Sequence, residues 1–278
     1  MSAQVQITIL ADNQVGSFHA RGEHGLAFWV CTASSRILFD TGQGLVLEDN
    51  ARTLRADLFS TTAIVLSHGH YDHTGGLAGV LKQAGAGVRV FAHPDAVSPK
   101  YVRGDSRVRD IAMPHESREA LAGIGSRFVT ARQATEVCPG FRVTGEIPRR
   151  HPEEAITEPF CTDSAGREPD LLPDDQALFF QTHAGTVILL GCAHAGLIST
   201  LDAVRDLTNG APIRAVIGGT HLRSASDERI AWTLAQLRRF KIPFLAPIHC
   251  TGQKASAALW TAFPRACRPC GAGATFEF

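Results

Sequence analysis

Three histidines and one aspartate stand within six residues of one another, directly after a short apolar run. Residues 63–66 predict a buried strand, and the amphipathic run that begins at Thr74 carries its leucine and valine residues on one helical face. The polar cluster therefore lies on the turn between the carboxyl end of a strand and a helix. Because α/β sheets form their binding sites at that edge, the motif predicts an α/β fold with a site here.

The spacing within the cluster indicates metal ligands. His68 and His70 are two residues apart on an extended segment, so their side chains point to the same side. Asp72 and His73 follow in the tight turn, where adjacent side chains diverge and can serve a second centre. Imidazole nitrogen and carboxylate oxygen are the usual ligands of zinc and similar divalent ions. The alternative, a solvated loop that happens to be rich in histidine, explains so dense a pattern poorly.

The cluster resembles the H-x-H-x-D-H signature of the metallo-β-lactamase superfamily, and the resemblance extends along most of the chain. It is strongest to the branch of metal-dependent hydrolases called β-lactamase superfamily II, whose members often carry the name dihydropterin ribofuranosyl-aminobenzene-phosphate synthase. The other matching segments are Leu10–Asn13, Glu23–Leu26, Leu38–Gly42, Thr144–Arg149, Asp174–Leu178, Gly191–Gly196, Gly218–Leu222 and Pro247–Gly252.

The resemblance implies a four-layer αββα sandwich and roles for several polar residues. Asp40 would lie beneath the metal site and orient a ligating histidine, although a simple turn residue is the other interpretation. The remaining residues of the matching segments would support the site or line a substrate pocket: Asp12, Asn13, Glu23, His24, Glu146 and Arg149.

Three later histidines complete the predicted site. His194, His221 and His249 each follow an apolar strand, so their strands would bring them to one edge of the sandwich. We expect His194 to join His68 and His70 on one metal, and His249 to join Asp72 and His73 on the other.

One position departs from the superfamily pattern. Many members place a bridging aspartate after the strand that here ends at Gly191, but this chain has Cys192. Cys192 could bind a soft metal as thiolate or be a bystander, and His221 could bind metal or substrate. One or two divalent ions are therefore expected, with zinc favoured over manganese or iron.

Composition excludes several classes of protein. The 27 basic and 27 acidic residues balance, which argues against generic binding to nucleic acid or to an anionic membrane. The first ten residues lack a basic segment followed by an apolar core, no apolar run approaches the length of a membrane span, and the seven cysteines are odd in number. We therefore expect a cytoplasmic protein without disulfides that acts on a small molecule.

Two polar stretches interrupt the pattern of strands and helices. We predict a single domain over residues 1–278, with insertions near 95–120 and 146–175. Long loops inside compact domains are often lids, so at least one insertion is expected to cover substrate rather than to be a mobile surface loop. Their basic residues, including Arg109 and Arg149, either bind an anionic substrate group or form a solvated face.

These features predict a metal-dependent hydrolase. A divalent ion would activate water, and Asp72 would hold that water and accept its proton. The substrate would be a small, anionic ester, lactone or phosphoester. Two alternatives stay open: a synthase acting on a pterin-like or aromatic amine phosphate precursor, and a non-enzymatic metal-binding protein.

Overall fold

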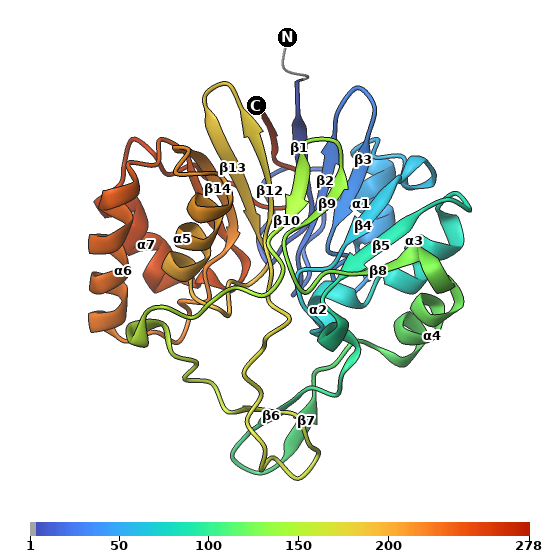
Figure 1. Ribbon diagram of the computed structural model, residues 1–278, viewed down its shortest axis with the longest axis horizontal. Coiled ribbons are helices and arrows are strands. Elements are labelled where there is room, and N and C mark those ends of the chain that lie inside the picture. The colour runs from blue at the N-terminus through green and yellow to red at the C-terminus, as the bar shows by residue number, and fades with distance from the viewer. Residues whose placement is uncertain (1–3) are drawn as a thin grey trace.

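Two large β-sheets face each other at the centre of the molecule, and helices cover the outer face of each (Figure 1). The computed structural model describes residues 4–278. Apolar side chains from both inner faces, among them Phe39 and Phe180, form one core cluster between the sheets. Each sheet also has one apolar cluster on its outer face, between the strands and the helices that cover them. The architecture is therefore the four-layer αββα sandwich that the sequence predicted.

The first sheet contains the strand that precedes the histidine cluster. Within residues 4–278 its order is β16 (Thr275–Glu277), β1 (Gln6–Ala11), β2 (Ala27–Cys31), β3 (Arg36–Phe39), β4 (Ala63–Val65), β5 (Arg89–Ala92) and β8 (Phe128–Thr130). Strands β3, β4, β5 and β8 run parallel, and β4 is fully buried among them. A continuous apolar run such as Ala63–Val65 suits a parallel strand that is covered on both faces.

The second sheet carries the later histidines at its strand ends. Within the described residues its order is β15 (Leu245–Ile248), β14 (Ile213–Gly219), β13 (Gly185–Leu190), β12 (Leu178–Thr182), β10 (Phe141–Val143) and β9 (Thr135–Cys138). Strands β13, β14 and β15 are parallel neighbours, so their carboxyl ends meet at one edge. The tight β12–β13 hairpin was predicted from sequence.

Helices pack on the outside of the two sheets. They are α1 (Leu47–Thr53), α2 (Tyr71–Thr74), α3 (Leu77–Gln83), α4 (His115–Gly123), α5 (Leu197–Leu207), α6 (Asp227–Phe240) and α7 (Gln253–Ala262). Short 3₁₀ turns are η1 (Leu58–Ser60), η2 (Pro94–Val97), η3 (Gly125–Arg127), η4 (Pro152–Glu154) and η5 (His249–Thr251). Helix α6 has strong end signals: Ser226 accepts a hydrogen bond from Arg229 N, and Lys241 ends the helix in the left-handed region.

The two insertions are more ordered than the sequence indicated. Strands β6 (Tyr101–Arg103) and β7 (Val108–Asp110) of the first insertion pair with β11 (Phe160–Cys161) of the second. This small sheet lies below the sandwich in Figure 1, on the side to which the loops around α2 extend. The prediction of irregular structure over residues 95–120 was therefore wrong, because short antiparallel pairing between distant segments leaves little local signal.

Several other elements differ from the sequence prediction. Leucines among charged positions predict a helix over residues 45–58, but helix α1 ends at Thr53, and Arg55 then adopts a left-handed backbone conformation. Strands β9, β10 and β16 and helix α7 were not predicted. None of the helices between residues 4 and 278 has the length and apolar character needed to span a bilayer. The expectation drawn from the first ten residues falls partly on residues 1–3, which lie outside the described residues.

Candidate metal centre

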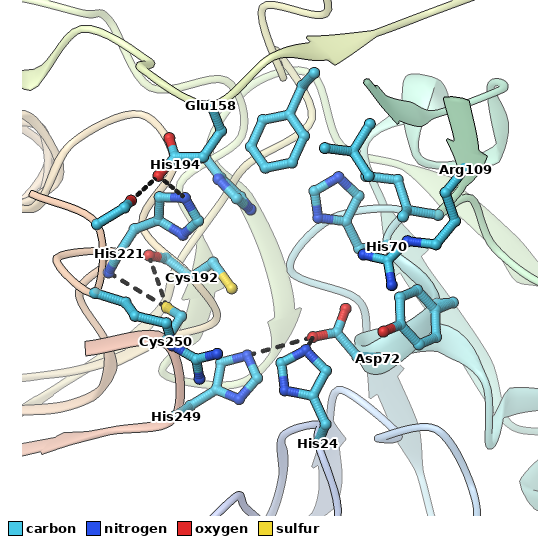
Figure 2. A pocket seen from close by; sticks show the side chains of 16 residues that line it. His24, His70, Asp72, Arg109, Glu158, Cys192, His194, His221, His249 and Cys250 are labelled. Carbon is cyan, nitrogen blue, oxygen red and sulfur yellow. Dashed lines mark hydrogen bonds and ion pairs between the residues drawn. The ribbon is translucent and has the colours of Figure 1, made fainter. Parts of the chain in front are cut away.

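Histidine, cysteine and aspartate side chains converge where the strands of the two sheets end. Ser67 and His68 follow β4, Cys192 and His194 follow β13, His221 follows β14, and His249 follows β15. A pocket of about 310 Å³ opens over them, and Figure 2 shows its lining side chains pointing inward from both halves of the sandwich. The sequence predicted that the strand ends carrying histidine would meet at one edge of the sandwich, and these side chains do lie together there.

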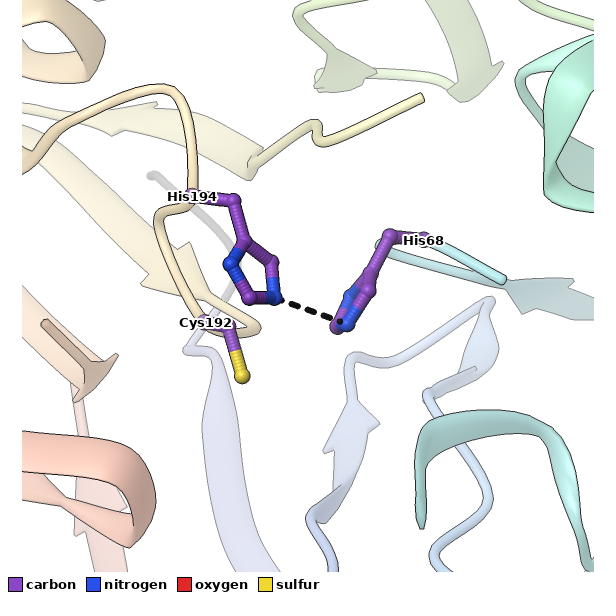
Figure 3. A group of neighbouring side chains, drawn as sticks. All are labelled: His68, Cys192 and His194. Carbon is purple, nitrogen blue, oxygen red and sulfur yellow. Dashed lines mark hydrogen bonds between the residues drawn. The ribbon is translucent and has the colours of Figure 1, made fainter. Parts of the chain in front are cut away.

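The first group of ligand atoms comes from His68, His70, His194 and Cys192. His68 Nε2 lies 2.9 Å from His70 Nδ1 and 3.3 Å from His194 Nε2. The ligand atoms of His68, Cys192 and His194 all lie within 4.8 Å of one another. Figure 3 shows the rings of His68 and His194 facing each other, with Cys192 beside His194. All four residues are buried. His70 Nε2 and His194 Nδ1 have no hydrogen-bond partner in the described part of the chain, so the cluster contains buried polar atoms that its own contacts leave unsatisfied.

The second group comes from His73, His249, Asp72 and the same Cys192. His73 Nε2 lies 3.1 Å from His249 Nε2 and 3.2 Å from Cys192 Sγ. Asp72 Oδ2 lies 3.6 Å from His249 Nε2 and 3.8 Å from His73 Nε2. Residues assigned from sequence to two different metals thus form two neighbouring groups, with Cys192 between them.

Hydrogen bonds behind the imidazoles fix which nitrogen of each ring faces the centre. Asp40 Oδ2 lies 2.7 Å from His73 Nδ1, and Asp40 also accepts hydrogen bonds from Ser67. Asn13 Oδ1 lies 2.9 Å from His249 Nδ1. A carboxylate or amide behind a ligating imidazole holds the ring in place and sets its tautomer. Asp40 and Asn13 therefore occupy the supporting positions that the sequence suggested.

Four of these histidines are neutral and so suited to metal binding, whereas His73 must release a proton before it can bind an ion. Burial, reinforced by neighbouring positive charges, lowers the pKa of His68, His70, His194 and His249 well below the usual value. Burial also disfavours the charged form of His73, but Asp40 and Asp72 raise its pKa to about 9. Neutral imidazoles carry the free lone pair that a divalent ion requires. The donor set therefore fits one or two divalent ions.

The backbone around the centre is strained at four residues that are not glycine. Asp40, Ala193, His221 and His249 all have φ between 51° and 58°. Each lies just after a strand that ends at the site, and left-handed conformations of this kind cluster at functional sites. His221, His249 and the two neighbours of Ala193, Cys192 and His194, line the pocket, while Asp40 lies behind His73.

A third group of possible metal ligands was predicted from the sequence only in part, since Cys192 and His221 were named as candidates and Cys250 was not. Cys192, His221 and Cys250 also have ligand atoms within 4.8 Å of one another. His221 Nε2 lies 3.4 Å from Glu158 Oε1 of the second insertion. Burial opposes the charge on His221 and on Glu158, yet Cys250 and Glu158 together raise the pKa of His221 to about 10, and His221 with Ser224 lowers the pKa of Glu158 to about 2. Cys250 follows His249 in a matching segment, but nothing in the sequence indicated the contact with Glu158.

His24 lies at the mouth of the pocket. Its ring stacks on that of His249 with centroids 5.6 Å apart, and its Nε2 lies 3.2 Å from Asp72 Oδ2. The side chain is 45% exposed, so His24 connects the buried carboxylate of Asp72 to solvent. The sequence placed His24 among possible pocket residues.

Asp12, Glu23 and Glu146 lie away from the pocket lining. Asp12 is buried beneath it, and burial raises the pKa of its carboxyl to about 7. Glu23 accepts hydrogen bonds from the backbone N–H groups of Gln43 and Leu45 and so holds the loop before α1. Glu146 is exposed, and its backbone N–H bonds to Arg132. None of these three side chains lines the pocket, so of the two predicted roles, support of the site or contact with substrate, the geometry favours support.

Arg149 also differs from its predicted role as an anion clamp. Its guanidinium donates hydrogen bonds to the carbonyl oxygens of His194, at 2.7 Å, and Leu171, at 2.6 Å. The first contact holds the loop that presents His194, and the second holds the end of the second insertion next to it. Arg149 is therefore a positioning residue, and the arginines that line the pocket are Arg109 and Arg223.

Comparison with known proteins identifies the family. The family model described as the metallo-beta-lactamase superfamily matches residues 20–193, which is more than half of the chain. The chain belongs to the metallo-β-lactamase superfamily. The resemblance first seen in the H-x-H-x-D-H cluster is thereby confirmed.

Full-length relatives of this superfamily member are known. It is 29% identical over 261 residues to the 7,8-dihydropterin-6-methyl-4-(β-D-ribofuranosyl)-aminobenzene-5′-phosphate synthase of Methanocaldococcus jannaschii, which covers 90% of this chain and 89% of the relative. An uncharacterised protein of the same organism is 31% identical over 255 residues, covering 91% and 93% of the two chains.

Solved structures show the same architecture. The chain is similar to Tm1679, a metal-dependent hydrolase of the β-lactamase superfamily, with 30% identity, 99% coverage of both chains and a TM-score of 0.83. Zinc-bound PqqB from Methylobacterium extorquens, at 13% identity and a TM-score of 0.59, covers 98% of this chain and all of its own and shares the fold.

Proposed function

We propose that this protein is a metal-dependent hydrolase of a small substrate that combines an ester, lactone or phosphoester bond with an anionic group. The observation that carries the proposal is the pair of converging imidazole groups that flank Cys192 and open onto one pocket. A divalent ion bound there supplies a nucleophile at neutral pH, by lowering the pKa of bound water to about 7, and polarises the oxygen of the scissile bond. The thiol of Cys192 favours zinc over manganese.

Asp72 is the proposed general base. Its carboxylate lies at the floor of the pocket, within 4 Å of His73, His249 and His24. It can hold the attacking water and accept its proton. His24 stacks above this carboxylate and reaches solvent, so it offers the proton a path out of the site.

The pocket wall supports an anionic substrate with an apolar body. Val102 on β6 pairs with Phe160 on β11 and with Arg109 on β7, and all three side chains line the pocket. This row excludes water from one side of the cavity. Neither Arg109 nor Arg223 has an ion-pair partner within residues 4–278, and in Figure 2 the guanidinium of Arg109 points inward above Asp72. Free guanidinium groups suit a carboxylate or a phosphate of the substrate.

The proposal is tested by a hydrolysis screen on metal-free and zinc-reloaded protein. Phosphodiesters, lactones and thioesters are each offered with and without a distal carboxylate or phosphate. We expect turnover only with metal and mainly for the anionic series. Asp72→Asn should lower kcat by about 10²- to 10⁴-fold, as the loss of a general base does. Glu146→Gln is the matched control, since that carboxylate is exposed outside the pocket.

Absence of turnover in every series, with metal bound in full, would exclude the hydrolase and leave the synthase and the non-enzymatic metal-binding protein. Turnover that is equal in the metal-free protein would exclude the metal's role. Asp72→Asn is also assayed for metal content, because Asp72 belongs to the second ligand group.

A synthase is the second candidate, and the relative from Methanocaldococcus jannaschii favours it. The same pocket would hold an aromatic amine phosphate, with the ring against Phe160 and the phosphate on Arg109. Incubation with an aminobenzene ribose phosphate and a pterin, followed by mass spectrometry, distinguishes the two reactions. A coupled product supports the synthase, whereas a product that has gained only water supports the hydrolase.

A further inference from the structure

Two cysteines and one histidine lie together at the side of the pocket: Cys250 and His221 belong to neither histidine group, and Cys192 is shared with both. Cys192 and Cys250 are buried after β13 and β15, and His221 follows β14 between them. Because these three strands are parallel neighbours, their carboxyl ends hold the three side chains together. The Sγ atoms of both cysteines and a ring nitrogen of His221 lie within 4.8 Å of one another.

Backbone contacts fix this cluster. The backbone N–H of His221 donates to Cys250 Sγ at 3.3 Å, and Cys250 Sγ lies 3.5 Å from the carbonyl oxygen of Cys192 (Figure 2). Gly219 packs so closely that a Cβ there would meet Cys250 Sγ and the carbonyl oxygen of Gly191 at 2.5 Å each. The two sulfur atoms are therefore held in place by the ends of the strands rather than by flexible loops.

His221 is arranged like the ligating histidines. An ion pair joins its Nε2 to Glu158 at 3.4 Å, in the way that Asp40 stands behind His73. Both of its buried ring nitrogens lack a hydrogen-bond partner within residues 4–278, and Nδ1 has no ion-pair partner there either. An imidazole that faces a carboxylate with one nitrogen and leaves the other open is the arrangement found around metal ligands.

We propose that Cys192, His221 and Cys250 form a third metal-binding position, selective for soft ions such as zinc, cadmium or copper(I). Two thiolates and one imidazole match the preference of these ions, whereas the histidine and aspartate groups accept harder ions as well. Cys192 is common to all three groups, so an ion at the third position takes this sulfur away from the hydrolytic centre. The position therefore goes beyond the proposed hydrolysis and does not depend on it.

Cadmium is the probe, because its resonance frequency reports the number of sulfur ligands. We expect ¹¹³Cd NMR of the wild-type protein to show one cadmium with two sulfur ligands. Cys250→Ser should convert that cadmium to one with a single sulfur and reduce the ultraviolet thiolate-to-cadmium band to the intensity of one thiolate. Cys192→Ser should remove sulfur ligation from the two histidine groups as well. Cys267→Ser is the matched control, since Cys267 is buried between β15 and the helices, away from the pocket.

The wild-type spectrum tests the proposal even if a variant fails to fold. Cadmium with at most one sulfur ligand, or a spectrum unchanged by Cys250→Ser, would overturn the third position. If the hydrolase screen fails but the cadmium spectrum shows two sulfur ligands, only the proposed reaction is overturned, and the third metal-binding position stands. His221→Gln provides the second variant, and it should weaken cadmium binding while keeping both sulfur signals.

Discussion

Lys100 Nζ lies 2.8 Å from Asp174 Oδ1, and both side chains are buried. The same ammonium lies 3.1 Å from Asp170, and the second oxygen of Asp174 accepts a hydrogen bond from Gly69 N at 2.8 Å. Gly69 separates His68 from His70, and a Cβ there would collide with the carbonyl oxygen of Ala96. The ion pair thus connects both insertions to the histidine motif.

Lys100→Met should destabilise the fold strongly. It leaves the carboxylates of Asp170 and Asp174 buried without their cation, and breaking a buried pair in this way costs about 3–5 kcal/mol. Urea unfolding of the metal-free protein measures the free energy of unfolding. Lys82→Met, at an exposed position on α3, should stay within about 0.5 kcal/mol of the wild type. A Lys100→Met protein as stable as the Lys82→Met control would show that the ion pair contributes nothing to stability.

Asp40→Asn should weaken metal binding while the fold persists. The asparagine cannot hold the His73 imidazole as the carboxylate does, and loss of such a partner typically lowers metal affinity about 10- to 100-fold. Competition with a chromophoric chelator measures the zinc dissociation constant. Asp49→Asn on the exposed face of α1 is the control and should leave the constant unchanged. Equal affinities in the two variants would remove Asp40 from the supporting shell.

His249→Ala should remove one metal and keep the other. His249 faces His73 and Asp72, whereas His68, His70 and His194 make their contacts on the other side of Cys192. Elemental analysis of protein purified without chelator should therefore show fewer equivalents than the wild type, without falling to zero. His115→Ala, at an exposed site on α4, controls for the loss of an imidazole. Wild-type metal content in His249→Ala would contradict the division into two groups.

Arg109→Ala and Arg223→Ala should each raise KM for an anionic substrate about 10- to 100-fold, since a hydrogen bond to a charged group contributes about 1.5–3 kcal/mol. An uncharged substrate with the same scissile bond should be little affected. Arg107→Ala, in the exposed turn between β6 and β7, is the control. Arg149→Ala should instead lower metal affinity, because it releases the carbonyl of His194. Identical effects on charged and uncharged substrates would rule out anion recognition by the pocket arginines.

The parts of the fold that could be predicted have strong local patterns. The β12–β13 hairpin consists of two nearly continuous apolar runs around a tight turn, and α5 repeats its buried apolar residues at helical spacing, at Leu197, Leu201 and Val204. Strand β16 has three residues and exists because it pairs with β1, more than 260 positions earlier in the chain. Short strands of this kind are determined by their distant partner, so their own sequence predicts them poorly.

The contrast between local sequence patterns and contacts of distant segments also holds for the metal site. His68, His70, Asp72 and His73 are close in sequence, so their spacing alone indicated a shared role. Glu158 reaches His221 only because the second insertion folds back over the end of β14. The direction of an arginine side chain is likewise a tertiary property, which is why Arg149 seemed as suitable for the substrate as Arg109.

The pairing of β6 with β11 determines how this pocket can be redesigned. One wall of the cavity is divided between two segments that are more than fifty residues apart, and each supplies the other's hydrogen-bonding edge. Grafting a single segment from a relative would leave one strand without its partner and Lys100 without its acids. Exchange of substrate preference between members of the family therefore requires that both segments be transplanted together, as one module.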